Sequence, residues 1–175
     1  IDLSTSHATS RHIATQGPLP HTIPAFWTMV LEYRSPVIIQ LTRFVEGHRD
    51  KCAVYLPLEP HTSVPLTLGS FGHATLETKT VATLNDDVEI RALRLSSPTG
   101  SFPILSITHY FFHGWPDFGV PSSPTSALTL FAHLHAHADT QADTHTTTTN
   151  NTPTLNTAPP HTEEKARSVP TPIRR

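Results

Sequence analysis

The sequence predicts an α/β fold in which a twisted mixed sheet is flanked by helices. A helix-like stretch at residues 22–34 leads directly into a short, β-branched, almost continuously apolar stretch at residues 37–42. That succession is typical of strands whose faces are covered by helices. At residues 64–95 the pattern changes to β-branched runs separated by turn residues, which indicates antiparallel strands. Residues 104–112 form the longest strand candidate.

The helix candidate at residues 22–34 is supported by its spacing and by its ends. Pro24 lies in the first turn, where a missing N–H costs little, and Pro36 follows the last turn. Apolar residues recur at spacings of three and four, as expected for a helix with one buried face: Ile23, Phe26, Trp27, Val30 and Leu31. We expect Phe26 and Trp27 to be core anchors.

The remaining strands follow from short apolar runs and from the residues that end them. The stretch at 37–42 is predicted to be buried on both faces, because its apolar residues do not alternate with polar ones. A charged connection at 46–51 leads to a second short strand at 52–56, which Pro57 ends. A turn is expected at 85–87, where the sequence reads Asn-Asp-Asp.

Residues 115–121, with the sequence Trp-Pro-Asp-Phe-Gly-Val-Pro, form a stiff loop that carries one carboxylate, Asp117. The loop connects the strand candidate at 104–112 with a helix candidate at 123–135. Its two prolines restrict the backbone, and Gly119 supplies freedom between them. Catalytic groups concentrate on loops held by a rigid scaffold, and a stiff loop that moves as a body is typical of a lid.

Residues 136–175 differ in composition from the rest of the chain. They hold eleven Thr and five Pro, and their only large aliphatic side chains are Leu155, Val169 and Ile173. Such a stretch cannot bury enough apolar surface to offset its ordering entropy. We therefore expect one domain at residues 1–135, followed by a disordered low-complexity tail. An O-glycosylated stalk is the alternative for a tract rich in Thr and Pro.

Charge and cysteine content argue against several classes of protein. The formal net charge of -2 and a pI near 6.7 provide no basic footprint for nucleic acid or an anionic membrane. No apolar run approaches the length of a membrane span, and the first residues lack the pattern of a secretory signal. The single cysteine, Cys52, excludes an internal disulfide framework, so we expect a cytoplasmic protein.

Five segments in a fixed order carry a resemblance to a known family. They are Ile-Ala-Thr-Gln-Gly-Pro-Leu at 13–19, Phe-Trp at 26–27, the strand candidate at 37–42, Lys-Cys-x-x-Tyr-x-Pro at 51–57, and the loop at 115–121. In order and spacing they resemble the classical protein tyrosine phosphatases. The resemblance implies the tyrosine-phosphatase-like fold, incomplete in this chain, a chemistry without cofactors, and phosphotyrosine-containing proteins as partners.

The resemblance assigns roles to four residues. Asp117 is implied as the general acid that protonates the departing tyrosine oxygen, and then as the base acting on water; a phenol has a pKa of about 10, so expelling it unprotonated is unfavourable. Trp115 is implied as the hinge-side anchor of a closing loop. Lys51 aligns with a lysine that meets the loop aspartate in the closed state, and Glu46 with a glutamate that positions the arginine of the phosphate cradle. Without the resemblance, we would interpret Asp117 as an ordinary turn residue and Glu46 and Lys51 as a solvated pair of charges.

The family's nucleophile is a cysteine followed six positions later by an arginine, on a loop that cradles phosphate and lowers the thiol pKa. The only cysteine is Cys52, and Leu58 stands six positions after it. We assign Cys52 no catalytic role. We expect the chain to be the middle of a phosphatase domain, cut at both ends and inactive as given. A family-like sheet without the cradle strand would leave residues 37–41 uncovered. Gly114, a departure from the family, adds backbone freedom at the hinge.

Other functions stay open at this point. The chain could be a non-catalytic phosphatase-like interaction protein whose tail replaces the cradle, or the tail could be translated non-coding sequence. Among the thirteen histidines, His133 and His137 lie four apart on a helix candidate, but zinc needs three or four ligands and no third is evident, so we expect no metal. The parent protein is either soluble or the intracellular part of a receptor-type protein.

Overall fold

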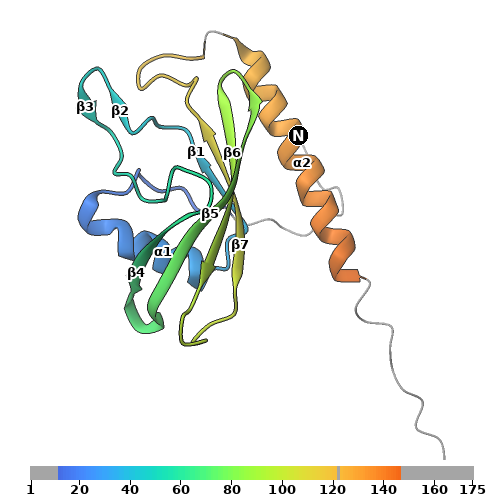
Figure 1. Cartoon of the computed structure of the whole chain (residues 1–175). Helices are drawn as coiled ribbons and strands as arrows, with labels where there is room; N and C mark the ends of the chain where they lie inside the picture. Colours follow the sequence, from blue (N-terminus) through green and yellow to red (C-terminus); the bar gives the residue numbers. More distant parts are fainter. Residues whose placement is uncertain (1–11, 122, 147–175) are drawn as a thin grey trace, which may run out of the picture. The chain divides into compact units, whose positions relative to one another are not determined.

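The computed structural model describes residues 12–121 and 123–146 of the chain, with side-chain environments up to residue 136. These residues form a mixed five-stranded sheet in the order β1-β7-β6-β5-β4, with helices packed against it (Figure 1). β1 is parallel to β7, and the other neighbours are antiparallel. The strands are β1 (Val37–Gln40), β4 (Thr62–Leu68), β5 (Gly72–Asn85), β6 (Val88–Ser96) and β7 (Leu105–Phe112). The predicted α/β fold with a mixed sheet is confirmed.

Besides the five-stranded sheet, the described residues form the two-stranded hairpin of β2 (Val45–Glu46) and β3 (Arg49–Asp50), two helices and two short 3-10 turns. The helices and turns are η1 (Pro20–Thr22), α1 (Ile23–Glu32), η2 (Gly69–Phe71) and α2 (Pro124–Thr146). α2 continues beyond residue 135, where we expected it to end. The reason is local: residues 136–146 contain three Ala and neither Gly nor Pro, so nothing in the backbone stops the helix.

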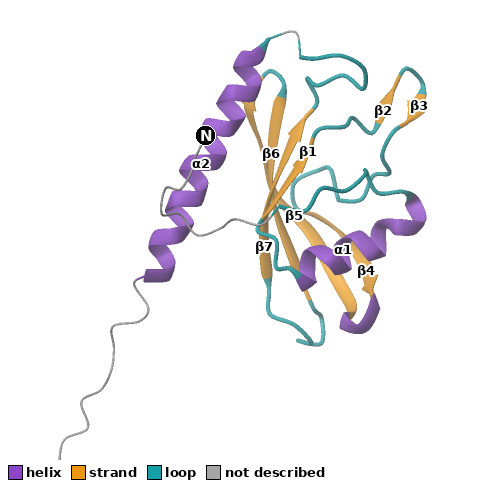
Figure 2. Cartoon of the chain, turned by 180° about the vertical axis from the view of Figure 1, so that it is seen from behind, coloured by secondary structure: helices purple, strands orange, loops and turns teal. Residues whose placement is uncertain are grey.

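α1 and α2 lie on opposite faces of the sheet (Figure 2). The alternation of side chains along β7 shows why. Leu105 and Ile107 belong to the core cluster beneath α1, whereas Tyr110 and Phe112 belong to the cluster beneath α2. Successive side chains of a strand point to opposite faces, so a strand covered on both sides is apolar at odd and even positions alike.

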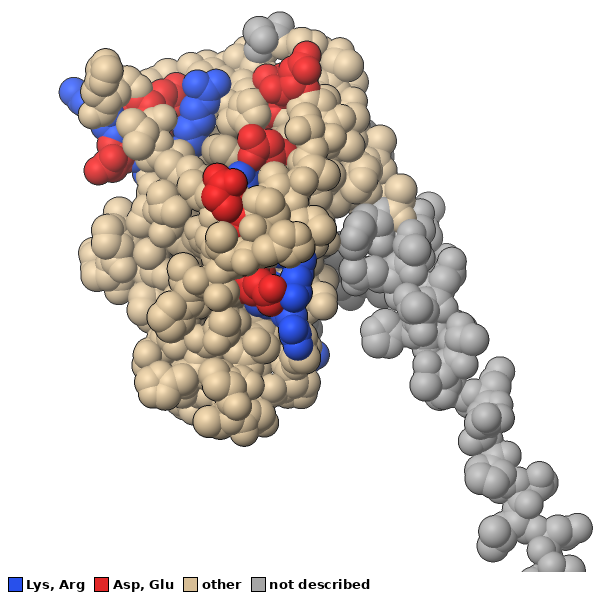
Figure 3. Space-filling view, in the orientation of Figure 1, with Lys and Arg blue, Asp and Glu red and all other residues tan. Residues whose placement is uncertain are grey.

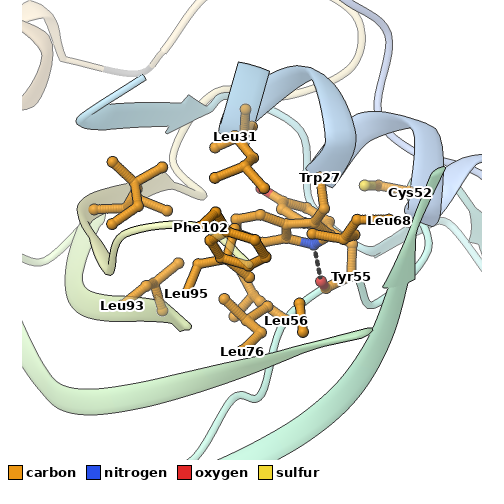
Figure 4. Packing of buried hydrophobic residues seen from close by; sticks show 14 residues of the cluster. Trp27, Leu31, Cys52, Tyr55, Leu56, Leu68, Leu76, Leu93, Leu95 and Phe102 are labelled. Atoms are coloured by element: carbon orange, nitrogen blue, oxygen red, sulfur yellow. Dashed lines mark hydrogen bonds between the residues drawn. The ribbon is translucent and has the colours of Figure 1, made fainter. Parts of the chain in front are cut away.

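The larger core lies between α1 and the sheet. Trp27 is fully buried there, with Leu68, Leu76 and Leu95 around it (Figure 4). The indole N–H of Trp27 donates to the backbone carbonyl oxygen of Tyr55 at 2.7 Å, so the one polar group of this ring is satisfied. Phe26 is partly buried and packs edge-on against Trp27. The predicted anchoring role of these two aromatic residues is confirmed.

β1 differs from its prediction. Among its four residues only Gln40 is buried, and Ile39 and the following Leu41 are 44% and 46% exposed. The physical reason is its place at the edge of the described sheet: β7 is its one strand partner there, so no described strand lies along its outer side. The exposure of this apolar stretch agrees with the expectation that residues 37–41 lack part of their cover.

The stretch at 52–56 is also different from its prediction, because it is irregular rather than a strand. Three of its side chains are nevertheless buried, since Cys52, Tyr55 and Leu56 all belong to the core beneath α1, whereas Val54 is exposed. The segment fills the core from a loop and does not join the sheet ladder. The turn expected at 85–87 is confirmed, since β5 ends at Asn85 and β6 begins at Val88.

The chain divides into two units, Ile1–His135 and Ala136–Arg175. Of the helices in the described part of the chain, none is both long and apolar enough to cross a membrane.

Candidate functional site

The loop that carries Asp117 leaves the sheet at the end of β7. Trp115 is half-buried and packs its ring edge-on against Phe112 of that strand, with 6.1 Å between ring centroids. This contact attaches the start of the loop to the cluster beneath α2. Residues 117–120 are exposed, and Phe118 is 88% exposed. The loop therefore has a packed base and an open tip.

A two-residue turn brings the other charged groups to this loop. β2 (Val45–Glu46) and β3 (Arg49–Asp50) form a short antiparallel hairpin. Gly47 and His48, which connect them, have φ of 56° and 61°. Two consecutive residues with positive φ define the hairpin turn whose twist matches the flanking strands. The tight turn keeps Glu46 at the end of β2 close to Lys51 just after β3, and both residues contact Asp117. Figure 3 shows charged side chains of both signs gathered over this hairpin.

Asp117 is held by two separate contacts from the hairpin. Its carboxylate Oδ2 lies 2.5 Å from the Nζ of Lys51. Its backbone N–H donates to the carboxylate of Glu46, with N–O distances of 3.1 and 3.3 Å. The Lys51 ammonium also lies 5.9 Å from the centroid of the Phe118 ring. The structure thus brings together Glu46, Lys51 and Asp117, which are far apart in sequence.

These contacts are open to solvent. The side chains of Lys51 and Asp117 are 23% and 33% exposed, so their ion pair contributes only about 0–1 kcal/mol to folding. The Asp117 carboxylate is therefore accessible from solvent while it is paired with Lys51. The Glu46 contact is one that the sequence did not predict: its carboxylate binds the backbone of the loop itself.

Cys52, in contrast to Asp117, is almost inaccessible to solvent. The side chain is 5% exposed, and burial raises the pKa of the thiol. Gly17 packs against it so closely that a Cβ at that glycine would lie 3.0 Å from the sulfur. A buried thiol with a raised pKa holds little thiolate at neutral pH, and only the thiolate is a nucleophile. The geometry of Cys52 is that of a packing residue.

A second polar group, buried beneath α1, had no sequence signal. The Tyr55 hydroxyl donates to Gln40 Oε1 at 2.9 Å and lies 2.9 Å from His109 Nε2. The Gln40 amide is oriented by its own donation to the Thr42 carbonyl at 2.7 Å, which leaves Oε1 as the acceptor. Because the single hydroxyl proton goes to Gln40, the histidine must donate from Nε2 to the tyrosine oxygen. The other ring nitrogen, Nδ1, is buried and has no hydrogen-bond partner among the described residues, which agrees with an unprotonated Nδ1 and a neutral ring.

The environment of this buried group strengthens that assignment. His109 is fully buried, and burial together with the charge of Arg91 lowers its pKa to about 3. Burial also raises the pKa of Tyr55. Arg91 lies beside His109 in the β6–β7 register and is 6% exposed. Its guanidinium donates to the carboxylate of Glu89 at 2.6 Å, which balances the charge.

No metal site is indicated near either group: in residues 12–121 and 123–136, no three His, Cys, Asp or Glu side chains come together as ligands. His133, one of the two histidines considered as metal ligands, instead contacts Tyr110, with 3.0 Å between its Nδ1 and the Tyr110 hydroxyl. The side chain of His137 lies outside the described residues. A shallow hollow of about 280 Å³ lies between residues 15–18 and α1, away from Asp117.

Comparison with known proteins agrees with the fold. A family model described as protein-tyrosine phosphatase matches residues 2–155. The protein-tyrosine-phosphatase PTP1 of Arabidopsis thaliana is 34% identical over 136 residues, which is 77% of this chain and 38% of that protein. The human tyrosine-protein phosphatase non-receptor type 9 is 38% identical over 117 residues, 67% of this chain and 18% of that protein. Human receptor-type tyrosine-protein phosphatase epsilon is 35% identical over 124 residues, which is 69% of this chain and 17% of that protein.

A solved structure shows the same architecture. PTPN18 in complex with HER2 phosphopeptides matches with a TM-score of 0.58 at 33% identity, covering 69% of this chain and 41% of that chain. Fold and sequence together define an α/β domain of the phosphatase class. The chain belongs to the protein-tyrosine phosphatase family. It spans less than half the length of each of these relatives.

Proposed function

We propose that this chain is the acid-loop portion of a protein tyrosine phosphatase whose complete form hydrolyses phosphotyrosine in proteins. The observation that carries the proposal is the placement of Asp117 at an exposed loop tip, with its carboxylate on Lys51 and its backbone on Glu46. Membership of the family supplies the reaction class. From the same family membership we infer the substrates, and we propose phosphotyrosine-containing proteins as the partners.

The reaction divides into two steps with balanced proton transfers. A cysteine thiolate attacks phosphorus, the bond to the tyrosine oxygen breaks, and Asp117 gives its proton to that oxygen as it leaves. Asp117, now ionised, accepts a proton from the water that attacks the phosphocysteine, and phosphate is released. Lys51 orients the carboxylate, Glu46 fixes the backbone beside it, and Trp115 anchors the loop as it closes. The roles of Asp117, Trp115 and Lys51 follow the resemblance. The resemblance gives Glu46 a different role, that of positioning the arginine of the phosphate cradle, and its contact with the loop backbone comes from the structure.

The nucleophile of this scheme is not among the 175 residues. Cys52 is buried, and Leu58 occupies the sixth position after it. We therefore infer that the chain alone does not turn over substrate. An assay of the purified chain with p-nitrophenyl phosphate is expected to show no release of nitrophenol. Turnover that Asp117→Ala abolishes would overturn this inference.

The acid role is tested in a complete protein that contains this sequence followed by an in-frame His-Cys-x5-Arg segment. Asp117→Asn is expected to lower kcat by about 10² to 10⁴, with a larger loss for phenyl phosphate than for p-nitrophenyl phosphate. The reason is that the more acidic phenol leaves readily without a proton. Asp86→Asn, an exposed carboxylate on another turn, serves as the matched control. Equal losses for both substrates would contradict a general-acid role.

The second candidate is a non-catalytic phosphatase-like interaction protein. The observation in its favour is the same inaccessible Cys52 with its raised thiol pKa. Sequencing the complete transcript distinguishes the two functions, because a stop codon without the His-Cys-x5-Arg segment favours the interaction protein. In either case we place the domain in the cytoplasm, in a soluble or receptor-type parent; relatives of both types exist.

A further inference from the structure

Asp87 contacts both ends of the segment that carries Asp117. It is the second residue of the tight turn between β5 and β6. At the start of the loop, the N–H of His113 donates to the backbone carbonyl of Asp87 at 2.9 Å. At the far end, the hydroxyl of Ser126 in the first turn of α2 donates to the Asp87 carboxylate at 2.6 Å. One turn residue therefore joins β7 and α2 across the loop between them.

Gly114 shows how closely this turn approaches the loop. A Cβ built on Gly114 would lie 2.5 Å from Asp87 Oδ1 and 2.6 Å from Asp87 Cβ, which is far inside van der Waals contact. The φ of Gly114 is not positive, so the glycine is required for space and not for backbone conformation. The sequence suggested that this glycine adds freedom at the hinge. In the structure it allows a tight contact instead.

Other bonds make this anchor rigid. The N–H of Asp87 donates to the side chain of Asn85 at 3.0 Å, which fixes the turn from within. The carbonyl of His113 accepts from the guanidinium of Arg43 at 2.6 Å, so the peptide groups on both sides of His113 are engaged. The Asp87 carboxylate also lies at the first turn of α2, where a negative charge is stabilised by the helix dipole.

We propose that Asp87 is a positioning residue that fixes the two ends of the acid loop, so that movement of Asp117 is confined to the segment between His113 and Ser126. The consequence for catalysis rests on the proposed function, since it matters only if Asp117 is the acid. The clamp itself is a property of the fold. Gly119, with φ of 105°, lies inside the confined segment and supplies its backbone freedom.

The test uses the two tryptophans of the full chain as reporters. With 5-fluorotryptophan incorporated, Trp115 reports on the loop and fully buried Trp27 reports on the core beneath α1. Asp87→Ala is expected to shift or broaden the Trp115 fluorine signal while the Trp27 signal stays unchanged. Amide exchange of His113 is expected to accelerate about tenfold, as for the loosening of one hydrogen bond. The matched control is Asp86→Ala, which removes the exposed neighbour on the same turn.

A pair of size changes tests the contact directly. Gly114→Ala is expected to disturb the Trp115 signal through its clash with Asp87. In an Asp87→Gly background, which lacks both the clashing side chain and the clamp, Gly114→Ala is expected to cause no further change beyond that of Asp87→Gly alone. Ser126→Ala is the milder variant and should raise exchange at the α2 end of the loop only. Equal effects of Asp86→Ala and Asp87→Ala, or an equally large effect of Gly114→Ala with and without Asp87→Gly, would overturn the proposal. None of these readouts uses phosphatase activity, so a failed acid role leaves their outcome unaffected.

Discussion

Two polar groups of this chain are built from the same three segments and have opposite environments. Gln40, Tyr55 and His109 form the group beneath α1, whose members are at most 6% exposed. The second group is formed by Glu46, Lys51 and Asp117, and it is open to solvent. Each of its residues lies a few positions before or after a residue of the first group in the sequence. The hydrogen-bonded side chains of the first group are uncharged, whereas those of the second group are charged.

The difference shows what burial does to polar residues. Burial disfavours charge, so the three side chains in the core are held in neutral states and hydrogen-bond to one another, although His109 Nδ1 has no hydrogen-bond partner among the described residues. An exposed group gains little from its ion pair and keeps the freedom to exchange protons and partners. The interior group can therefore position the segments, while the exposed group is available for chemistry.

The largest expected effect comes from breaking the buried group. Tyr55→Ala should lower the free energy of unfolding by about 3–5 kcal/mol, because it removes a ring packed against Phe26 and Phe44. Tyr55→Phe, which removes only the hydroxyl, should cost about 1–2 kcal/mol. Urea unfolding provides the measurement, and Tyr33→Phe at a 63% exposed position is the control. If the two Phe variants cost the same, the buried hydrogen bonds contribute nothing.

The buried group should also make stability depend on pH. The folded chain protonates His109 only near pH 3, whereas the unfolded chain takes up that proton near the ordinary pKa of 6.5. The stability linked to the neutral ring is therefore fully present above pH 6.5 and is lost as the pH falls from 6.5 toward 3. The slope is at most about 1.4 kcal/mol per pH unit.

This pH dependence is separated from that of the carboxylates by comparing variants. His109→Gln should show a flatter stability curve between pH 6.5 and 4, and His21→Gln at an exposed position should follow the unmodified chain. Parallel curves for all three proteins would show that the buried histidine does not titrate differently on folding.

The smallest expected effect comes from the exposed group. Lys51→Met should lower the free energy of unfolding by less than about 1 kcal/mol, and the loss should shrink further in high salt. Lys79→Met is the matched control, since Lys79 forms a comparable surface ion pair with Glu77 at 2.7 Å. A loss above about 2 kcal/mol for Lys51→Met alone would mean that the exposed group is structural, contrary to the comparison.

The sequence predicted the fold through residues whose partners are local or whose pattern is periodic. The spacing of Phe26 and Trp27 identified α1, and the Asn-Asp-Asp turn identified the β5–β6 hairpin. The sequence could not show that β1 lies at an edge, because its apolar pattern is the same whether or not a strand lies beside it. The extension of α2 was not predicted, because the Thr-rich composition after residue 135 indicates a tail, whereas residues 136–146 contain no Gly or Pro to end the helix.

For the candidate site, resemblance located the charged residues and the structure supplied their contacts. The loop motif at 115–121 singled out Asp117, but no pattern indicated that Glu46 accepts the backbone N–H of that residue. Asp87 was counted only as a turn residue, since its contacts to the loop come from segments 26 and 39 positions away. Long-range hydrogen bonds of this kind leave no periodic signal in the chain.

The parallel pairing of β1 with β7 has a consequence for how the chain folds. Val37 pairs with Thr108, so this ladder closes a very long loop, whereas Asn85 and Val88 pair across a two-residue turn. Closing a long loop costs more entropy than closing a short one, so we expect the β5–β6 hairpin to form early and β1 to dock last. In kinetic terms, Ile38→Val should speed unfolding and leave the refolding rate nearly unchanged, while Leu93→Ala should slow refolding. The chain would then assemble its scaffold first, and both polar groups would form in the final step, because each takes a residue from β1 or the hairpin that follows it.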